Sequence, residues 1–342
     1  MRRRARELGA DLVGIAPAAL EPEPGDPRAY EAWVAKGMHG SMAYMARDPS
    51  VRSSITRWFP QARSVVLMAF SYSGRSGTAR EATHGSGRFA RYSLSDDYHA
   101  ILGAKTRALL DWFASLGPRV EGKAFVDTSP VLERLYARRA GLGWTGKNTM
   151  LVSPKLGSFF FLAGAAVDAE LEPDEPMPDH CGTCDRCLKA CPTAAFPAPR
   201  VLDASRCVAY LTIEHRGAVP EGLRGGCGDW VFGCDVCQKA CPFNRFAVTN
   251  PIFTPRLSEE ESLEALVGLD ERRFKERFKP TPVERAGIAG LKRNSLLAMG
   301  NSGEARFIPL LERFARDPDP VLAEQARWSL ARLSALPAPS EL

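Results

Sequence analysis

The chain has 342 residues, of which 25% are charged, and a formal net charge of +5 at pH 7. This length gives room for two or three domains with ample cores, and the composition is that of a soluble globular protein. No segment reaches the apolar length of a membrane span. The modest positive charge permits contact with a polyanion, but it fits an ordinary surface of mixed sign equally well.

The first six residues carry four arginines, as in a twin-arginine export signal. Glu7, Gly9 and Asp11 interrupt the apolar segment that such a signal needs. We interpret this stretch as the polar face of a first helix. We therefore expect a cytoplasmic protein with no membrane association.

Residues 1–178 alternate strand-like apolar runs with helical patterns, which favours a layered α/β domain. The strand candidates are Asp11–Ala16, Ser64–Tyr72, Arg119–Val126, Met150–Ser153 and Phe159–Val167. Helical periodicity covers Asp97–Leu116 and Val131–Ala140. The proline-rich and acidic stretch Glu172–Asp179 is typical of a linker.

Asp97-Tyr98-His99 with Gly103 comes close to D-x-H-x-x-G, the loop through which some cobalamin proteins supply a histidine to cobalt. The glycine comes one place late, because Leu102 stands where the pattern needs it. We therefore do not assign His99 to cobalt and interpret it as a polar residue at the start of a helix.

Asp127 follows the apolar run Ala124-Phe125-Val126 and precedes the helical pattern Val131–Ala140. An acid at the carboxyl end of a strand is where α/β folds place reactive groups. The same position also suits the N-cap of the following helix. The residues alone leave both interpretations open.

Gly141 to Asn148 fits the start of a phosphate-binding loop, G-x4-G-K, but Asn148 replaces the Ser or Thr that the pattern needs. A phosphate-binding loop also follows a strand and opens a helix. Here a predicted helix comes before and an apolar strand comes after. We therefore reject nucleotide hydrolysis.

Nine cysteines are present, and seven of them form one complete and one partial bacterial ferredoxin run. The complete C-x2-C-x2-C-x3-C-P run is Cys181, Cys184, Cys187, Cys191 and Pro192; the partial run is Cys234, Cys237, Cys241 and Pro242. Thiolates at these spacings hold 4Fe–4S cubes, and the last cysteine of each run binds the other cube. One cluster therefore takes Cys181, Cys184, Cys187 and Cys241, and the other takes Cys191, Cys234 and Cys237.

The second cluster needs one more thiolate, because Val231 stands where the second run lacks its first cysteine. Cys207 and Cys227 are the two candidates. We favour Cys207, which follows an ordered-looking stretch, over Cys227, which stands in a glycine-rich loop and would be a free thiol. Zinc sites do not need the full run, and disulfides suit small secreted chains, so iron–sulfur chemistry is the interpretation we adopt.

Beyond the first cysteine run, Tyr210-Leu-Thr-Ile-Glu-His-Arg-Gly217 and Arg224 are polar and aromatic. They could touch a cofactor or an anionic substrate, or form a solvated loop. Further on, Leu291–Asn301 resembles Val321–Leu333, with a helical pattern and the turn Asp317–Pro320 between them. This arrangement is typical of HEAT-type repeats, which present a surface to a large partner, but it also fits a small helical cap.

Five features occur in a fixed order: Val126-Asp127-Thr-Ser-Pro130-Val-Leu-Glu133, Gly143-Trp144-Thr-Gly146-Lys147-Asn148-Thr149, the two cysteine runs, Tyr210–Gly217 and the helical repeats. Over nearly its whole length the chain resembles the epoxyqueuosine reductases, the last enzymes of queuosine synthesis in bacterial tRNA. Many ferredoxins share the cysteine runs, whereas the combination is much more specific. The family is related in design to the reductive dehalogenases.

The resemblance implies a base-off cobalamin, without a protein histidine below the cobalt, beside the two 4Fe–4S clusters. It implies that epoxyqueuosine becomes queuosine at the wobble position of tRNAs with a GUN anticodon, which carry aspartate, asparagine, histidine and tyrosine. The reaction is a two-electron reduction that removes the epoxide oxygen as water. Asp127 is then the general acid, with a pKa raised by partial burial over the corrin.

By the same resemblance, corrin contacts are expected from Arg52, Tyr98, Asp127, Asn148, Ser153, Tyr210 and Gln238. For tRNA contacts we look to Glu214, His215, Arg216, Arg224, Lys292 and Arg293, with the flipped wobble base entering a pocket. We expect a monomer that receives electrons from an unidentified low-potential donor.

The predicted architecture is an α/β (α+β) cobalamin-binding catalytic domain over residues 1–178, a ferredoxin-like double-cluster domain over 179–250, and tRNA-facing α-helical HEAT-like repeats over 251–342. A small-molecule corrinoid reductase of the reductive dehalogenase type is the main alternative, but such enzymes usually carry a twin-arginine signal. An electron-transfer subunit would need no acid over a pocket. An RNA-binding repeat protein would not need the cysteines.

Overall fold

The structure is a computed structural model that describes residues 1–20, 27–73, 84–115 and 120–335. The predicted strand start at Arg119 and helix end at Leu116 lie outside these residues. No helix in the described ranges combines the length and apolar character that a membrane crossing needs.

A four-stranded sheet forms the centre of the N-terminal half, with the strand order β1-β2-β7-β4. Its members are β1 (Leu12–Pro17), β2 (Ser64–Ser71), β4 (Gly122–Phe125) and β7 (Phe160–Val167). Every neighbouring pair is antiparallel. The predicted strands are therefore confirmed with small shifts of their ends, and the sheet belongs to an α+β arrangement.

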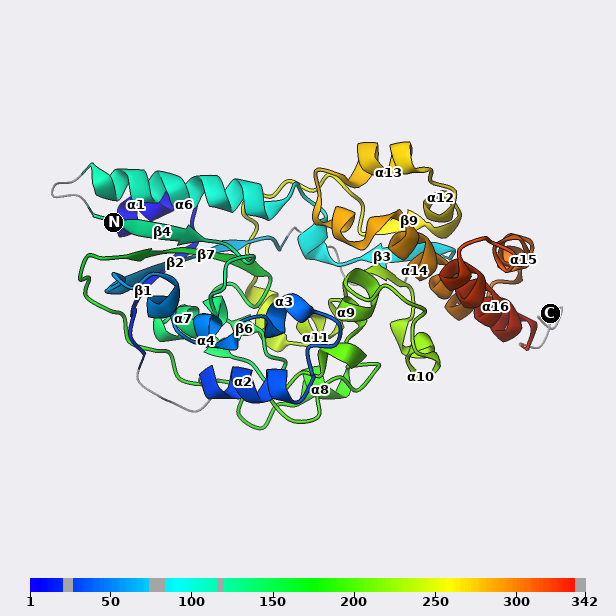
Figure 1. Ribbon diagram of the computed structural model, residues 1–342, viewed down its shortest axis with the longest axis horizontal. Helices are drawn as coiled ribbons and strands as arrows, with labels where there is room; N and C mark the ends of the chain where they lie inside the picture. The colour runs from blue at the N-terminus through cyan, green and yellow to red at the C-terminus, as the bar shows by residue number, and fades with distance from the viewer. Residues whose placement is uncertain (21–26, 74–83, 116–119, 336–342) are drawn as a thin grey trace.

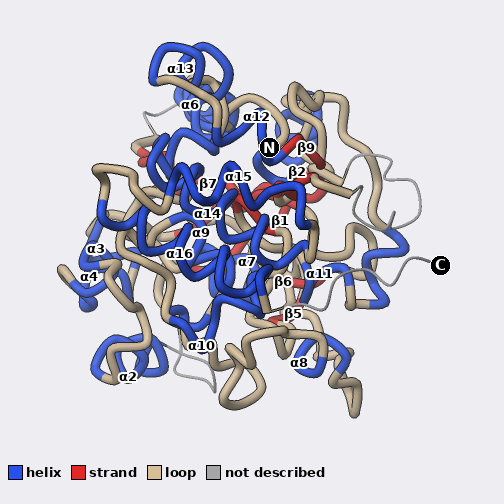
Figure 2. Tube along the Cα trace, turned by 90° about the vertical axis from the view of Figure 1, so that its right-hand side faces the viewer, coloured by secondary structure: helices blue, strands red, loops and turns tan. Residues whose placement is uncertain are grey.

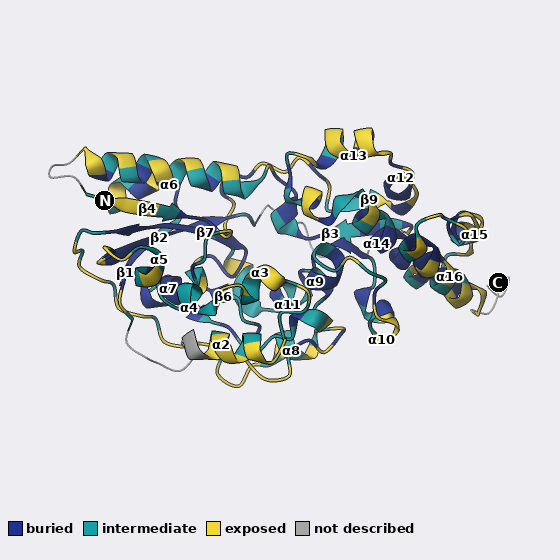
Figure 3. Ribbon diagram, viewed as in Figure 1, coloured by how far each residue is buried: buried dark blue, intermediate teal, exposed yellow. Residues whose placement is uncertain are grey.

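Both faces of this sheet are covered, because the side chains of β2 alternate between two apolar cores. Val65 and Leu67 pack with Tyr136 of α7 (Glu133–Arg139), whereas Val66 and Met68 pack on the opposite side. That opposite side is covered by α6 (Tyr98–Ala114) and α1 (Arg2–Glu7). The result is a three-layer sandwich in which β2 and β7 are buried and the outer face of α6 is exposed (Figures 1 and 3).

Short elements fill the space between the sandwich and the cysteine region. They are α2 (Pro27–Ala35), α3 (Ala43–Ala46), α4 (Pro49–Ser53), α5 (Ile55–Trp58) and the hairpin of β5 (Trp144–Thr145) and β6 (Leu151–Val152). The hairpin confirms that a strand, and not a helix, follows the glycine-rich segment at Gly141. The stretch Glu172–Asp179 forms neither helix nor strand, as a linker should.

The cysteine region is built from single helical turns and one strand. The α-helices are α8 (Arg186–Lys189), α9 (Val208–Ile213), α10 (Glu221–Arg224) and α11 (Val236–Lys239), the 3-10 turns include η4 (Pro242–Phe246), and the strand is β8 (Trp230–Phe232). The helices α8 and α11 occupy equivalent places in the two cysteine runs and lie against each other.

A second sheet, in the order β8-β3-β9, joins the three predicted domains. The strand β3 (Ser86–Phe89) belongs to the first predicted domain, β8 to the second and β9 (Glu260–Ser262) to the third. Phe89 and Phe232 enter one apolar core with the C-terminal helices. None of these three strands was predicted from the sequence: β3 and β9 show no apolar run, and the apolar run of β8 has only three residues.

The C-terminal part contains α12 (Leu263–Val267), α13 (Glu271–Phe278), α14 (Gly287–Ser302), α15 (Ile308–Phe314) and α16 (Pro320–Ser334). The helices α14 and α16 pack closely, with α15 beside them (Figure 2). The expected sequence of helix, turn and helix is thus present. Its assignment to HEAT-type repeats stays a prediction.

Candidate active site and cluster region

Asp127 lies just beyond the end of β4, in backbone of an unusual conformation. Its φ is +44°, in the left-handed region that few residues other than glycine adopt. The Asp127 backbone N–H donates to the carboxylate of Glu133. The N-cap of α7 is Leu132 and not Asp127, so the structure does not support the capping interpretation.

The carboxylate of Asp127 ends a chain of hydrogen-bonded side chains. The Nε2 atom of His99 is hydrogen-bonded to Oδ2 of Asp127 at 3.1 Å. The other ring nitrogen, Nδ1, is hydrogen-bonded to Oδ1 of Asp97 at 2.6 Å. The Tyr98 hydroxyl also donates to Asp127, and its ring stacks flat on Phe161 at 4.1 Å between centroids. His99 is therefore a polar residue at a helix start, as predicted, but it also orients Asp127.

The pKa values of this group differ from our expectation. Burial would raise the pKa of Asp127, but the hydrogen bonds from His99 and Tyr98 and the charge of His99 outweigh it, so this pKa is lowered. The predicted rise is thus wrong for this structure. Burial would lower the pKa of His99, but its bonds to the two carboxylates raise it to about 9. Burial and Asp127 raise the pKa of Glu133 to about 8.

A cavity of about 490 Å³ opens close to this group. It is lined by Ser41, Met42, Tyr44, Glu214, His215, Arg216, Gly217 and Arg285. Burial raises the pKa of Tyr44, and the carboxylates of Glu214 and Asp127 add to that rise, so the cavity lies within electrostatic reach of Asp127.

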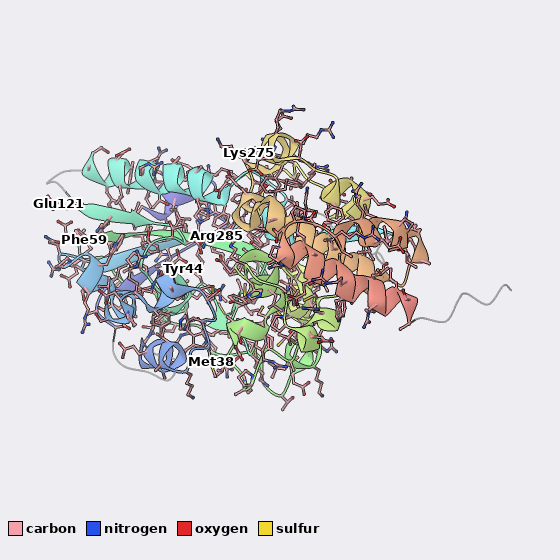
Figure 4. All side chains as sticks on the ribbon, turned by 45° about the vertical axis from the view of Figure 1, so that its right-hand side comes forward. Met38, Tyr44, Phe59, Glu121, Lys275 and Arg285 are labelled. Carbon is pink, nitrogen blue, oxygen red and sulfur yellow. The ribbon has the colours of Figure 1, made fainter. Side chains whose placement is uncertain are left out.

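The wall of the cavity joins segments far apart in the sequence. Arg285 pairs with both carboxylate oxygens of Glu214 at 3.0 Å, and its guanidinium lies 5.6 Å from the ring centroid of Tyr44. Figure 4 shows Tyr44 and Arg285 near each other at the centre of the molecule. Sequence analysis missed both residues, and no motif marks them.

The predicted tRNA residues divide into cavity-lining and structural groups. Glu214, His215 and Arg216 line the cavity, whereas Arg293 is 1% exposed. Its guanidinium donates to the carbonyls of Leu211, His215 and Gly217 and to the side chain of Asn294.

Arg224 is 6% exposed, pairs with Glu324 and donates to the carbonyl of Val219. Neither Arg224 nor Arg293 presents its guanidinium to a phosphate, because both are buried and use their donors inside the protein. We therefore correct their assignment as tRNA contacts. Lys292, next to Arg293 on α14, is partly exposed.

The predicted corrin contacts come from several elements. Asn148 donates to the carbonyl of Cys237 at 3.4 Å, and Gln238 accepts from Ser158 at 3.1 Å. Ser153 is buried and accepts from the Lys155 backbone.

Two more predicted corrin contacts lie near the large cavity and near Asp127. The Tyr210 hydroxyl bonds to the backbone and side chain of Ser41, on the rim of the cavity. Arg52 reaches the carbonyl of Ser129, two residues beyond Asp127. The structure thus links Asn148 and Gln238 to the cysteine region, and Tyr98 and Arg52 to Asp127.

Thiols of the first cluster set surround one cavity of about 110 Å³. Its lining includes Cys181, Cys184, Cys187 and Cys241, together with Trp144, Lys147, Arg186 and Phe243. The indole N–H of Trp144 donates to the sulfur of Cys181 at 3.3 Å. Hydrogen bonds to cluster sulfurs are one means by which proteins adjust cluster potentials.

The second set of thiols is grouped around Cys207. Burial raises the pKa of Cys237 to about 12, and the charges of Cys207 and Cys191 add to the rise. Burial also raises the pKa of Cys234, again with contributions from Cys207 and Cys237. Within the described ranges no three His, Cys, Asp or Glu side chains form a ready-made site for a single metal ion. The assignment of cluster ligands therefore depends on the spacing of the cysteines and on the two sets of thiols described above.

Cys227 is fully buried in an apolar core and its thiol donates to the carbonyl of Leu223 at 3.5 Å. Burial raises its pKa to about 12. This packing suits a structural thiol, and the choice of Cys207 as the eighth ligand stays a prediction.

Comparison with known proteins defines first the class and then the family. A family model described as a 4Fe-4S double cluster binding domain matches residues 180–244. A redox-active double-cluster domain packed against a sandwich with a carboxylate–imidazole chain defines an iron–sulfur oxidoreductase. A second family model, epoxyqueuosine reductase QueG, matches residues 52–128.

Relatives that match nearly the whole length of the chain determine its family. It is 38% identical over 341 residues to the epoxyqueuosine reductase of Xanthomonas campestris pv. campestris, covering 97% of this chain and 95% of the relative. It is 40% identical over 338 residues to that of Pseudomonas aeruginosa, covering 96% and 92%. The chain belongs to the epoxyqueuosine reductase family.

Solved structures agree with this placement. A crystal structure of epoxyqueuosine reductase with a tRNA-Tyr epoxyqueuosine-modified stem loop matches with a TM-score of 0.88 at 31% identity. That match covers 97% of this chain and 88% of the other. The structure from Streptococcus thermophilus matches with a TM-score of 0.85 at 27% identity, covering 98% and 90%.

Proposed function

We propose that this chain reduces epoxyqueuosine to queuosine in tRNA. Membership of the family supports the reaction, and the Asp97–His99–Asp127 chain beside an open cavity is the observation that carries it. The balance is simple: the epoxide takes up two electrons and two protons, both carbon–oxygen bonds break, and an alkene and water form.

The electrons come through two 4Fe–4S clusters held by the cysteines. We assign Cys181, Cys184, Cys187 and Cys241 to one cluster, and Cys191, Cys207, Cys234 and Cys237 to the other. The two sets of cysteine side chains described above are consistent with this division. The second cluster would lie nearer the cavity lined by Glu214, because Tyr210, three residues after Cys207, bonds to Ser41 of that cavity's wall.

The residues between this cluster and Asp127 fit a cobalamin. Tyr98 and Arg52 would lie on the Asp127 side of a corrin. Asn148, Ser153 and Gln238 are buried and partnered within the protein, so their amide and hydroxyl groups would bind the amide arms of a corrin only after those hydrogen bonds are redirected. When bound, a cobalamin supplies low-potential cobalt chemistry that no side chain provides. His99 would not be available to bind a metal ion, because both of its ring nitrogens are engaged by carboxylates.

Asp127 and His99 together handle the proton. Because the pKa of His99 is about 9, its imidazole is protonated at neutral pH. The proton on Nε2 passes to Oδ2 of Asp127 and from there to the departing oxygen, while Asp97 stabilises the imidazolium through Nδ1. His99 is partly exposed, with 32% of its side chain accessible, so solvent can replace the proton.

The cavity is the entrance for the modified nucleoside. Glu214, His215 and Arg216 line it together with Tyr44 and Arg285. Arg293 holds the backbone of this wall in place through three carbonyls. We expect the substrates to be tRNAs with a GUN anticodon. The monomeric state, the cytoplasmic location and the assignment of the C-terminal helices to HEAT-type repeats also stay predictions.

The direct test uses enzyme reconstituted anaerobically with iron, sulfide and cobalamin, a chemical low-potential reductant, and tRNA from cells that lack this step. Nucleoside mass spectrometry is expected to show loss of one oxygen from the wobble nucleoside, and only when cobalamin is present. Fully loaded enzyme that leaves the nucleoside unchanged would contradict the proposal and favour a small-molecule corrinoid reductase.

A further inference from the structure

The first cluster set lies closer to the surface than the second. Cys184 is exposed, whereas Cys191, Cys207, Cys234 and Cys237 are all at least partly buried. The cavity that the first set surrounds is also lined by Lys147, Arg186 and Phe243. An electron that enters from outside therefore meets this set first.

Apolar side chains are exposed beside this set. Within the described ranges only three large apolar side chains are exposed, and two of them are Phe246, at 45%, and Val248, at 43%. Phe246 ends η4, the turn that begins directly after Cys241 and whose Phe243 enters the cavity. Contiguous exposed apolar patches with a polar rim often mark contact sites.

The exposure of these side chains does not come from a loosely held segment. Asn244 on the same turn accepts from the Ser158 backbone at 2.5 Å and donates to the carbonyl of Gln238. Two residues beyond Phe246, the carbonyl of Val248 accepts from the Ser71 hydroxyl. The backbone is thus fixed while the two side chains face solvent, as a preformed contact surface requires.

Basic side chains lie at this cavity and on the turn beside it. In the described part of the chain Lys147, Arg186 and Arg245 take part in no ion pair, and Arg245 lies over the Phe246 ring at 4.5 Å. The nearby acids Asp179 and Asp185 are neutralised by Arg200 and Lys189. We call Lys147, Arg186, Arg245, Phe246 and Val248 the cluster face.

We propose that the cluster face docks a small acidic one-electron carrier protein, which is the immediate reductant of this chain. In each encounter the reduced carrier gives up one electron and the first cluster gains it, so two encounters supply one epoxide. An apolar centre with a charged rim suits a weak, transient complex, because steering by charge speeds encounter without slowing release.

RNA is the less suitable occupant of this surface. The exposed centre is apolar rather than a row of phosphate donors. The cavity assigned to the nucleoside shares no lining residue with the cavity of the first cluster set. The carrier and the tRNA can therefore bind at different places on the molecule.

Stopped-flow reduction of the reconstituted holoenzyme tests this proposal without tRNA. The probe is a photoreduced, acidic plant-type [2Fe–2S] ferredoxin, and the signal is loss of the visible absorbance of the 4Fe–4S clusters. The test variant is Arg186→Glu with Arg245→Glu. The matched control is Arg272→Glu with Lys275→Glu on α13, which lies at the opposite edge from α8 (Figures 1 and 4).

We expect the face variant to lower the second-order rate constant at low salt by roughly tenfold or more and to abolish its decrease with salt. Phe246→Ser should also lower the rate but keep the salt dependence. The control and reduction by dithionite should stay within about twofold of wild type. If the double variant fails to retain iron, the reduction rates of the single variants Arg245→Glu and Phe246→Ser test the proposal instead. Both of these residues lie outside the cysteine runs.

Equal reduction rates for wild type and face variants, or equal slowing by the α13 control, would overturn the proposal. Sedimentation that shows a wild-type dimer dissociated by Phe246→Ser would also overturn it, because the face would then be covered by a second copy. Because no tRNA is present, a failure of the proposed tRNA activity leaves this result unaffected.

Discussion

At the scale of single residues, one histidine determines how the carboxylate of Asp127 behaves. Burial alone would raise the pKa of the Asp127 carboxyl, but the hydrogen bonds and the charge of His99 lower it instead. The proton therefore stays on His99, which is itself held by Asp97 at 2.6 Å. The acid of this site is therefore the Asp127–His99 pair, which titrates as one unit.

The pair predicts a loss of activity at high pH. Because the pKa of His99 is about 9, turnover should be constant below that value and fall as the pH rises through it. His99→Gln keeps a hydrogen-bonding side chain but removes the proton, so we expect turnover to fall roughly 10²-fold and this pH dependence to disappear, with little change in KM. An unchanged pH profile in His99→Gln would contradict the relay.

The same pKa predicts how stability depends on pH. The folded pKa of His99, about 9, lies above the usual value of about 6.5. Its contribution to the free energy of unfolding is therefore complete below about pH 6.5 and is lost as the pH rises through about 9. Denaturant unfolding of wild type and His99→Gln should show a difference at the lower pH that shrinks at the higher one.

The two cysteines outside the runs predict different iron contents. Cys207→Ser should reduce the iron retained after reconstitution from roughly eight to roughly four per chain, because one cube loses a ligand. Cys227→Ser should retain the full content and lose about 1 kcal/mol of stability, because a buried thiol becomes a hydroxyl. The reverse pattern of iron content would assign Cys227 as the ligand.

At the scale of elements, α14 supports the wall of the cavity. Arg293 is buried within this helix and binds the backbone between Leu211 and Gly217. A buried guanidinium satisfied only by oxygens of the protein is a structural group, and its removal leaves those carbonyls without donors.

Arg293→Met should therefore reduce the free energy of unfolding by about 3 kcal/mol. The neighbouring Lys292→Met, on the same helix but partly exposed, should change it by less than about 0.5 kcal/mol. Chemical denaturation of both variants measures this difference. Equal stability of the two variants, with tRNA affinity reduced in Arg293→Met alone, would instead restore Arg293 as a tRNA contact.

The elements also show what can be predicted from sequence. The strands at Ser64 and Phe159 and the helix after Asp97 have strong apolar periodicity, and all three are confirmed. Short elements such as α3 carry no such pattern, and their positions depend on distant partners. The burial of Arg293 could not be predicted, because the sequence shows its charge and not its packing.

At the scale of the whole molecule, sequence suggested three successive domains, whereas the sheet β8-β3-β9 draws one strand from each. Such pairing cannot be predicted from local periodicity, because the partners are far apart in the chain. The cysteine spacing predicted a double-cluster domain, which the family match over residues 180–244 supports, but it left the eighth ligand open between Cys207 and Cys227. Tyr44 and Arg285 could not be placed in the site, since only the fold brings them together.

The shared sheet predicts that the C-terminal part is needed for folding. A chain ending at residue 250 would lose β9 and expose Phe89, Val231 and Phe232, which are at most 1% exposed in the full chain. We expect such a chain to be insoluble or to lack a cooperative thermal transition. A soluble fragment with a full complement of iron would show that the first two predicted domains fold without the third.

The proposed reaction depends most on Asp127, and one substitution tests the role of this residue most directly. Asp127→Asn keeps the shape of the side chain and tolerates a φ of +44°, but it cannot deliver a proton. In the reconstituted system, nucleoside mass spectrometry should show conversion of epoxyqueuosine to queuosine slowed by at least about 10²-fold. Iron and cobalamin content should be unchanged. Conversion at the wild-type rate by a fully loaded Asp127→Asn enzyme would contradict the central claim that this carboxyl delivers the proton to the departing oxygen.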